Sequence, residues 1–305
     1  MSKAIIAIDK SKSYRVYLTI TTEMAEEARK IHETTPLATA GLGRVLTAAG
    51  LMGIMMKNHK DKLTIQFKGD GPAKAILATA LGDGSVKGYI SNPDVDLPLT
   101  KDGKLDVGRS LGIGDLTVIR DFGLKEPYLG TIALVSGEIA DDLAAYFFIS
   151  EQQNSSVALG VKVERDYSVG AAGGMIIQML PGGEEGAVDA LEELIGKMDP
   201  LTTIIDRVLK KSKGKTEAGI VEDLLREIFK SMPEEFGVEK IGEGEIKLTC
   251  DCCEDRLEQV LATVGKEELQ AMIDEDGQAE MQCQFCLKKY CFGRERLQKI
   301  LEEIS

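Results

Sequence analysis

Hydrophobic and polar positions follow different patterns in three successive parts of the chain. In the first part, residues 1–183, short segments of alternating polarity mix with longer apolar runs, and glycines separate them. Alternation over four to eight residues is typical of a half-buried strand, and apolar residues three or four positions apart are typical of an amphipathic helix. Strands are predicted at 13–20, 63–67, 73–80, 85–90, 116–120, 129–135, 157–163 and 175–179, and helices at 23–33, 37–57 and 138–150.

Glycine-rich turns indicate the fold class of this first part. Gly-Asp-Gly segments at 69–71 and 82–84 bracket the predicted strand 73–80, which favours antiparallel strands joined by short loops. Because few strand–helix–strand units are repeated, we predict a mixed α+β domain rather than a doubly wound sheet. The longest weakly polar stretch, 36–56, contains Arg44, and we expect a buried helix there rather than a membrane span.

The second part, residues 184–240, has helical periodicity. Asp199-Pro200 is expected to begin one helix, with Asp199 as its N-cap, and Thr216 is expected to cap another. The apolar stripes of these helices must be buried, and two interpretations are open: a small helical subdomain of its own, or a cover over the first domain. The stripes are Val188, Leu191, Leu194, Ile195 and Met198; Leu201, Ile204, Ile205, Val208 and Leu209; and Ile220, Leu224, Leu225, Ile228 and Phe229.

The third part, residues 241–305, is too short to bury a hydrophobic core that is stable without a disulfide or a metal. Its pattern predicts a short strand before the first cysteine, helices near 254–264, 266–273 and 294–304, and a strand leading to Cys283. All six cysteines of the chain lie in this part: Cys250, Cys252, Cys253, Cys283, Cys286 and Cys291. The last of them falls in a strand-like segment and is expected to be a core residue.

Cysteines clustered in this way favour a metal site over a disulfide scaffold. The apolar run Ala4–Ile8 ends at Asp9 and is too short for the core of a signal peptide, so we expect a cytoplasmic protein whose thiols are reduced at rest. Two thiol pairs separated by a helical segment can supply the four ligands of a tetrahedral zinc site. Six buried free thiols and an iron–sulfur cluster are the less favoured alternatives.

Spacing determines the ligands only in part. Cys283 and Cys286 form a C-x-x-C pair, whereas Cys250 combines either with Cys253, as C-x-x-C, or with Cys252, as C-x-C. If the segment before Cys250 is extended, side chains 250 and 252 point to the same side and can share one metal. Cys253 lies where a helix is expected to begin.

Composition narrows the classes of partner. Lys and Arg total 37 and Asp and Glu total 50, a net charge of −13, which disfavours binding of nucleic acid or anionic membranes through bulk charge. Residues 250–305 hold seven basic and thirteen acidic side chains, so a nucleic-acid-binding zinc ribbon is disfavoured as well. We therefore expect neither nucleic acid nor a membrane as a partner.

Two enzymatic interpretations fit poorly, and we expect a protein that is not an enzyme. The segment from Gly108 to Gly112 matches the G-x-S-x-G motif of hydrolases, but a strand follows it, and both histidines, His32 and His59, lie upstream and are expected on helix surfaces. A dithiol oxidoreductase would place one C-x-x-C at a strand–helix junction. A regulatory module fits better, because oxidation of its thiols would remove the metal ligands and unfold it.

Several segments carry a resemblance to a known family. They are Tyr146–Gln152, Ala171–Pro181, Ser85–Tyr89, and Cys250-Asp-Cys252 with Cys283-Gln-Phe-Cys286 followed by Tyr290 and Phe292. On these segments the chain resembles, over nearly its whole length, the 33-kDa heat-shock protein family, the redox-regulated holdase chaperones of bacteria. The C-x-C and C-x-x-C pattern at this separation is specific to that family.

The resemblance implies that Cys250, Cys252, Cys283 and Cys286 hold one zinc ion per chain in a reduced, inactive state. It implies that oxidation forms the disulfides Cys250–Cys252 and Cys283–Cys286, releases zinc, and unfolds the C-terminal redox-switch domain together with the helical linker, residues 184–240. The linker is then the cover over the N-terminal chaperone core. The exposed apolar surface would hold unfolding client proteins without ATP in a stress response, with a homodimer as a possible active form.

Two cysteines depart from the family pattern. Cys253 stands where the family usually has a small polar residue and is a possible alternative ligand, and Cys291 is additional. The alternative function for such a chain is a constitutive, zinc-stabilised interaction protein whose thiols have no sensing role.

Overall fold

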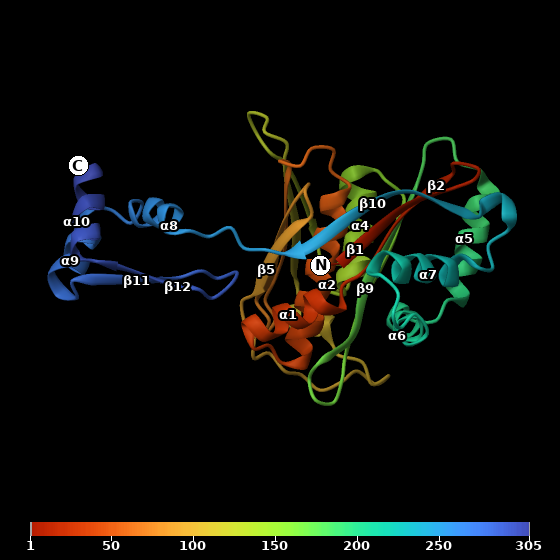
Figure 1. Ribbon diagram of the computed structural model, residues 1–305, viewed down its shortest axis with the longest axis horizontal. Coiled ribbons are helices and arrows are strands. Elements are labelled where there is room, and N and C mark those ends of the chain that lie inside the picture. The colour runs from red at the N-terminus through yellow and green to blue at the C-terminus, as the bar shows by residue number, and fades with distance from the viewer. Residues whose placement is uncertain (1, 305) are drawn as a thin grey trace. The chain divides into compact units, whose positions relative to one another are not determined.

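The computed structural model describes residues 2–304 and divides into two compact units, one up to Leu248 and the other from Thr249 on (Figure 1). Each unit has its own hydrophobic core. The helices at 185–229 belong to the first unit, and so does strand β10 (Val238–Leu248), part of which the sequence pattern grouped with the C-terminal domain. The functional division into core, linker and switch stays a prediction.

The first unit contains a ten-stranded sheet in the order β7-β6-β3-β4-β5-β10-β1-β2-β9-β8. Neighbouring strands are antiparallel except β10 and β5, which run parallel where Lys247 and Leu248 pair with Ser85 and Val86. The mixed α+β class is confirmed, and each predicted strand of the first part is present. The remaining strands are β1 (Ser2–Asp9), β2 (Tyr14–Ile20), β3 (Lys62–Gly69), β4 (Ala75–Leu81), β5 (Ser85–Ile90), β6 (Gly114–Asp121), β7 (Tyr128–Ala133), β8 (Ser155–Val163) and β9 (Val169–Met179).

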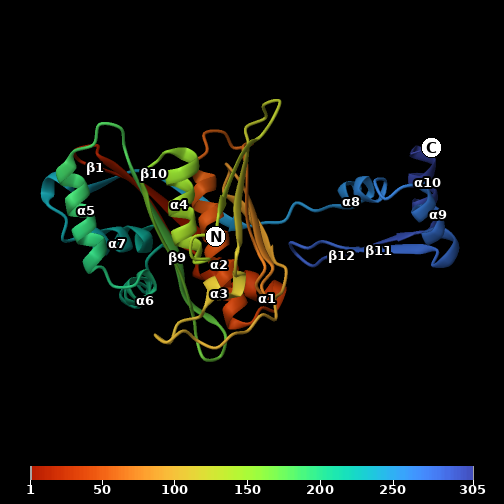
Figure 2. The same cartoon turned by 180° about the vertical axis from the view of Figure 1, so that it is seen from behind.

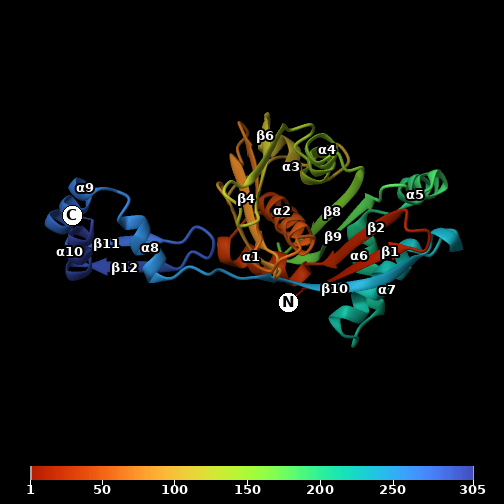
Figure 3. The same cartoon turned by 90° about the horizontal axis from the view of Figure 1, so that it is seen from above.

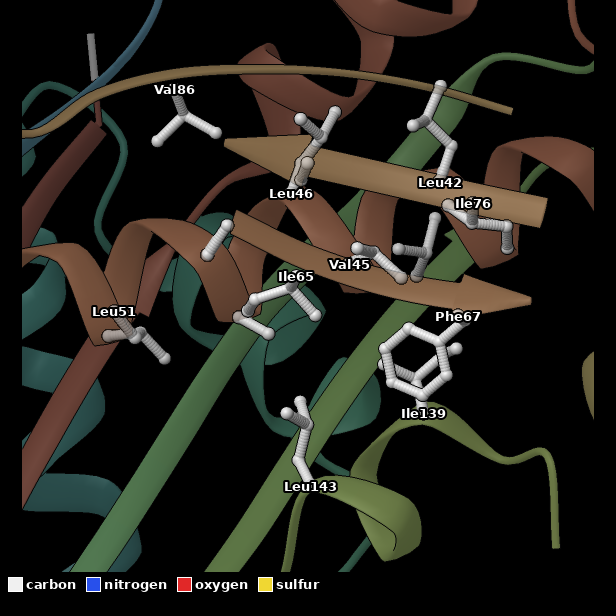
Figure 4. Packing of buried hydrophobic residues seen from close by; sticks show 14 of the residues in the cluster. Leu42, Val45, Leu46, Leu51, Ile65, Phe67, Ile76, Val86, Ile139 and Leu143 are labelled. Carbon is white, nitrogen blue, oxygen red and sulfur yellow. The ribbon is translucent and has the colours of Figure 1, made fainter. Parts of the chain in front are cut away.

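Helix α2 (Pro36–Ile54) lies between the two halves of the sheet, with β4 on one side and β8 and β9 on the other (Figure 3). Small residues allow this close approach: a Cβ atom on Gly50 would lie 2.6 Å from Cγ2 of Ile246 in β10. Figure 4 shows side chains of α2, β3 and β4 packed together with Ile139 and Leu143 of α4 (Ile139–Glu151). Helix α2 is long and apolar enough to cross a membrane, but 89% of its apolar window is buried inside the fold, which agrees with the buried helix expected there.

Three helices cover the opposite face of β1, β2 and β9: α5 (Glu185–Lys197), α6 (Leu201–Lys211) and α7 (Glu217–Phe229) (Figure 3). Their predicted stripes meet the alternating face of β2, where Tyr14, Val16 and Leu18 are buried. Tyr14 also donates a hydrogen bond of 2.6 Å to the carbonyl of Phe236, in the short 3-10 helix η1 (Glu234–Phe236). Of the two interpretations of this segment, the packing favours the second, in which α5, α6 and α7 together form a cover over the sheet.

One of the two predicted helix caps is correct. The hydroxyl of Thr216 accepts the backbone N–H of Gly219 at the start of α7. Asp199 is not the cap of α6, because the helix begins one residue later than expected, after Pro200. The Asp199 carboxylate instead accepts a hydrogen bond of 2.7 Å from Arg207, in the second turn of that helix.

Two further expectations concern residues near α1 (Thr22–His32) and α3 (Val107–Leu111). His32 was expected on a surface, but it is buried, with its Nε2 3.1 Å from the carbonyl oxygen of Gly88, because α1 packs against both α2 and β9. His59 is exposed in a turn. Ser110 lies inside α3, where its hydroxyl donates to the carbonyl of Val107, so the G-x-S-x-G segment does not form the strand–turn–helix of a hydrolase.

The second unit is a β-hairpin with helices (Figure 2). Its buried residues form a small core, to which the hairpin and all three helices contribute. The elements are α8 (Glu254–Leu261), α9 (Lys266–Glu275), β11 (Gln278–Gln282), β12 (Lys289–Gly293) and α10 (Arg294–Glu303). The core residues are Leu261, Leu269, Ile273, Ala279, Tyr290, Phe292, Leu297 and Ile300.

Candidate metal centre

One half of the candidate site is the turn between β11 and β12, which contains Cys283 and Cys286. The turn is closed by backbone hydrogen bonds from Cys283 to the carbonyl of Lys288 (3.0 Å) and from Leu287 to the carbonyl of Cys283 (2.8 Å). Leu287 adopts a positive φ of 57°, which lets the chain reverse directly after Cys286. The geometry presents both thiols at one end of the hairpin.

The other half is the irregular segment between β10 and α8, which contains Cys250 and Cys252. The Sγ atom of Cys250 lies 3.6 Å from that of Cys283, and the Sγ atom of Cys252 lies 3.4 Å from that of Cys286. All four Sγ atoms lie within 4.8 Å of one another.

These separations fit a tetrahedral thiolate site. With Zn–S bonds of about 2.3 Å, the edge of a regular tetrahedron of sulfur atoms is about 3.8 Å. Four sulfur donors without a carboxylate or carbonyl among them are the soft ligands that zinc accepts and that magnesium and calcium do not. The residues present therefore suit one zinc ion.

The two remaining cysteines lie outside this group. Cys253 is exposed and occupies the N-cap position of α8, so the structure gathers Cys252 rather than Cys253 with the other three. Cys291 was expected to be a core residue, but it is exposed. The reason is the alternation of β12, in which Tyr290 and Phe292 face the core and the residue between them faces solvent.

Tyr290 is a site residue whose role the residue pattern did not predict. Its hydroxyl oxygen lies 3.1 Å from Sγ of Cys252 and donates a hydrogen bond of 3.1 Å to the carbonyl oxygen of the same residue. The only signal in the sequence was its position in the alternating strand after the second thiol pair. The hydroxyl orients Cys252, as hydrogen-bonding groups behind a metal ligand commonly do.

Cys252 ionises more readily than Cys250 and Cys286. Burial opposes ionisation of Cys252, but hydrogen bonds from Tyr290 and the neighbouring thiols outweigh it and lower its pKa to about 7. Burial raises the pKa of Cys250 and that of Cys286. Because like charges repel at these distances, four thiolates need a cation among them.

The site adjoins the core of the second unit. Cys252 and Leu257 pack against its buried residues, and Tyr290 belongs to both the core and the thiol cluster. Loss of the metal ligands would therefore disturb the packing of the hairpin.

Comparisons with known proteins agree in one description. A family model described as "Hsp33 protein" matches residues 2–293. A "33 kDa chaperonin" of Clostridium perfringens is 46% identical over 303 residues, which cover 99% of this chain and 91% of that protein. One from Alkaliphilus oremlandii is 45% identical over 295 residues, covering 96% and 94%. The crystal structure of a 33 kDa chaperonin, a heat shock protein 33 homolog from Thermotoga maritima, has a TM-score of 0.84 at 33% identity, covering 99% of this chain and 98% of that one.

Proposed function

The chain belongs to the Hsp33 family of chaperones, and we propose that it is a redox-regulated, ATP-independent holdase, inactive when reduced and activated by oxidation. The family resemblance seen in the sequence is confirmed. The proposal includes one zinc ion per chain held by Cys250, Cys252, Cys283 and Cys286, and no enzymatic activity.

The observation that carries the proposal is the convergence of these four sulfur atoms. They come from two segments more than thirty residues apart in the chain, yet all lie within 4.8 Å. When bound, zinc supplies a cation that holds four thiolates together and cross-links the two segments. Four free thiols without such a role would have no reason to meet at these distances.

Oxidation would act on the ligands themselves. We propose the disulfides Cys250–Cys252 and Cys283–Cys286; each forms when a pair of thiolates gives two electrons to a peroxide, which takes up two protons from solvent and is reduced to two water molecules. A disulfide sulfur no longer serves as a thiolate ligand. The second unit then keeps only its small core and loses the cross-link between its two segments.

The surface that holds clients would come from the cover. Helices α5, α6 and α7 bury the apolar face of β1, β2 and β9 together with their own stripes. If the cover loosens when the second unit unfolds, both faces become available to apolar segments of unfolding client proteins. The proposal places the protein in the cytoplasm, with a possible homodimer as the active form and with neither nucleic acid nor a membrane as partner.

The test is an aggregation assay on a thermally unfolding client, with reduced and with peroxide-treated full-length protein. Suppression of light scattering only after oxidation, together with release of about one zinc per chain to a chromogenic chelator, is expected. The Cys283→Ser variant should not hold zinc in the reduced state, while Cys291→Ser, which removes an exposed thiol outside the cluster, should behave as the wild type. Equal suppression by both states of the wild type would favour the constitutive interaction protein instead.

A further inference from the structure

The two ends of the ten-stranded sheet differ in how they are protected. Strand β8 forms one end, and none of its residues is exposed. A Cβ atom on Gly160 would lie 2.5 Å from Cγ2 of Thr202 in α6, and Lys162 forms ion pairs with Glu164 and Asp206. The pairing of β8 with β9 also shifts register at Lys162. Charge, an irregular register and a covering helix are the usual means of blocking a sheet edge.

Strand β7, at the other end, has helix α4 on its inner face, where a Cβ atom on Gly130 would lie 2.8 Å from Cε2 of Tyr146, but it lacks the charge and the irregular register. Its sequence, Tyr-Leu-Gly-Thr-Ile-Ala, contains no charged residue and no proline, and its pairing with β6 is regular. Within residues 2–304 no strand pairs with its other side. Leu129, Thr131 and Ala133 are all exposed.

The register determines which backbone groups face the open side. The amide of Leu134 donates to the carbonyl of Gly114, so these two residues are a hydrogen-bonded pair. Such pairs recur at every second residue of an antiparallel ladder, so the backbone groups of Ile132, Gly130 and Tyr128 also point toward β6. The amides and carbonyls of Leu129, Thr131 and Ala133 therefore point away from β6. They form a ready template for one more strand.

Exposed apolar side chains lie on both sides of this template. Leu129 is 62% exposed on the outer face of the sheet. On the inner face, Tyr128 donates a hydrogen bond of 2.9 Å to the carbonyl of Ser150, and the adjacent Phe148 and Ile149 in the last turn of α4 are exposed. Figure 3 shows α4 beside β6 at this end of the sheet. An added strand would place alternate side chains against each group.

We propose that the open edge of β7 binds an extended, apolar segment of a client polypeptide as an additional strand. The inference rests on the proposed chaperone function: the edge is one client-contacting element, already open before oxidation, and holding a client also requires the apolar faces that the cover releases on oxidation. An unfolding chain exposes both apolar side chains and unpaired backbone groups, and this edge offers partners for both.

Charge favours a client over a second copy of the chain. Residues 113–151, which contain β6, β7 and α4, hold seven acidic and two basic side chains, and one of the basic ones, Arg120, is paired with Glu151. Two copies joined edge to edge would bring these acidic surfaces together, in a chain of net charge −13. A segment with lysine or arginine beside its apolar residues suffers no such repulsion.

The test uses reduced full-length protein and a fluorescent peptide of alternating valine and threonine with lysine at both ends. Leu129→Lys and Thr131→Lys should each weaken binding, measured by anisotropy, about tenfold. Leu99→Lys is the matched control, because Leu99 is 58% exposed and lies in a loop outside β7; it should bind as the wild type. Amide exchange at Leu129, Thr131 and Ala133 should slow when the peptide is added.

A second peptide distinguishes strand addition from nonspecific hydrophobic binding. Methylation of alternate backbone nitrogens removes the peptide's donors on one edge while its side chains stay, and it should weaken binding as much as Leu129→Lys does. Equal binding of both peptides, or equal loss in Leu99→Lys, would overturn the inference. A reduced dimer that Leu129→Lys converts to monomer would overturn it in favour of a second copy. A wild type that gains no activity on oxidation contradicts the proposed switch, but not peptide binding at this edge.

Discussion

The hydroxyl of Tyr290 is shared between the sulfur and the carbonyl oxygen of Cys252, at 3.1 Å from each. A core residue of the second unit is thereby tied directly to a candidate metal ligand. The position of Cys252 and the packing of the core around Tyr290 therefore depend on each other.

Tyr290→Phe should weaken zinc binding by the reduced protein about tenfold, because the ring keeps its packing while Cys252 loses the group that orients it. Competition with a chromogenic chelator measures the effect. Tyr167→Phe, at an exposed tyrosine of the first unit, is the control and should leave the affinity unchanged. Equal affinity in the two variants would mean that Tyr290 has no role in the site.

Cys252→Ser should abolish tight zinc binding, whereas Cys253→Ser should keep about one zinc per chain, because only Cys252 has its sulfur within the four-thiol group. Metal analysis of the purified reduced variants decides between them. Zinc kept by the first variant and lost by the second would reverse the assignment.

Removal of zinc from the reduced protein by a chelator should unfold the second unit and leave the first unit folded. A structural zinc contributes on the order of 10 kcal/mol, and the core of this unit is small. Amide exchange resolved along the chain is the measurement. Protection that persists from residue 250 onward without metal would contradict the coupling of metal to fold.

Leu224→Ala should loosen the cover and give the reduced protein part of the activity of the oxidised one. Leu224 is fully buried in α7 against the sheet, and truncation of such a leucine costs about 2 to 5 kcal/mol. Arg226→Ala, on the exposed side of the same helix, is the matched control. The aggregation assay without oxidant compares them; inactivity of both variants when reduced would argue against the cover as the regulated element.

Glu26→Gln should lower the stability of the first unit at neutral pH and have no effect near pH 2. The hydrogen bond from Arg29, assisted by the backbone N–H of Val169, lowers the pKa of Glu26 to about 2. A carboxylate with a depressed folded-state pKa adds stability above its unfolded pKa of 4.5, and this stability is lost as the pH falls toward 2.

The expected size of this effect is on the order of 1 kcal/mol, because the Glu26–Arg29 pair is partly solvated. Thermal unfolding of Glu26→Gln at several pH values measures it. Glu27→Gln makes the same change at an exposed position of α1 and should lower stability less. A constant difference between Glu26→Gln and the wild type down to pH 2 would exclude the ion pair as its cause.

Elements buried on one face could be predicted from the sequence alone. The stripes of α5, α6 and α7 appear where expected, because one-sided burial leaves a periodic pattern that local sequence records. Strand β1 was not predicted. Ala4, Ile5, Ile6 and Ala7 are apolar in succession because they pack against α2 on one side and the cover on the other, so no alternation is left to detect.

The sequence by itself determined the class of the site, since clustered thiol pairs suit zinc wherever the chain brings them. Thiol spacing left Cys252 and Cys253 open, and the family resemblance implied Cys252, which the structure places in the cluster. Only the tertiary structure decided that Tyr290 supports the cluster and that β10 belongs to the first unit's sheet. The same holds for the unprotected edge of β7. Each depends on which distant segments become neighbours, and the local pattern of residues does not record pairings across the fold.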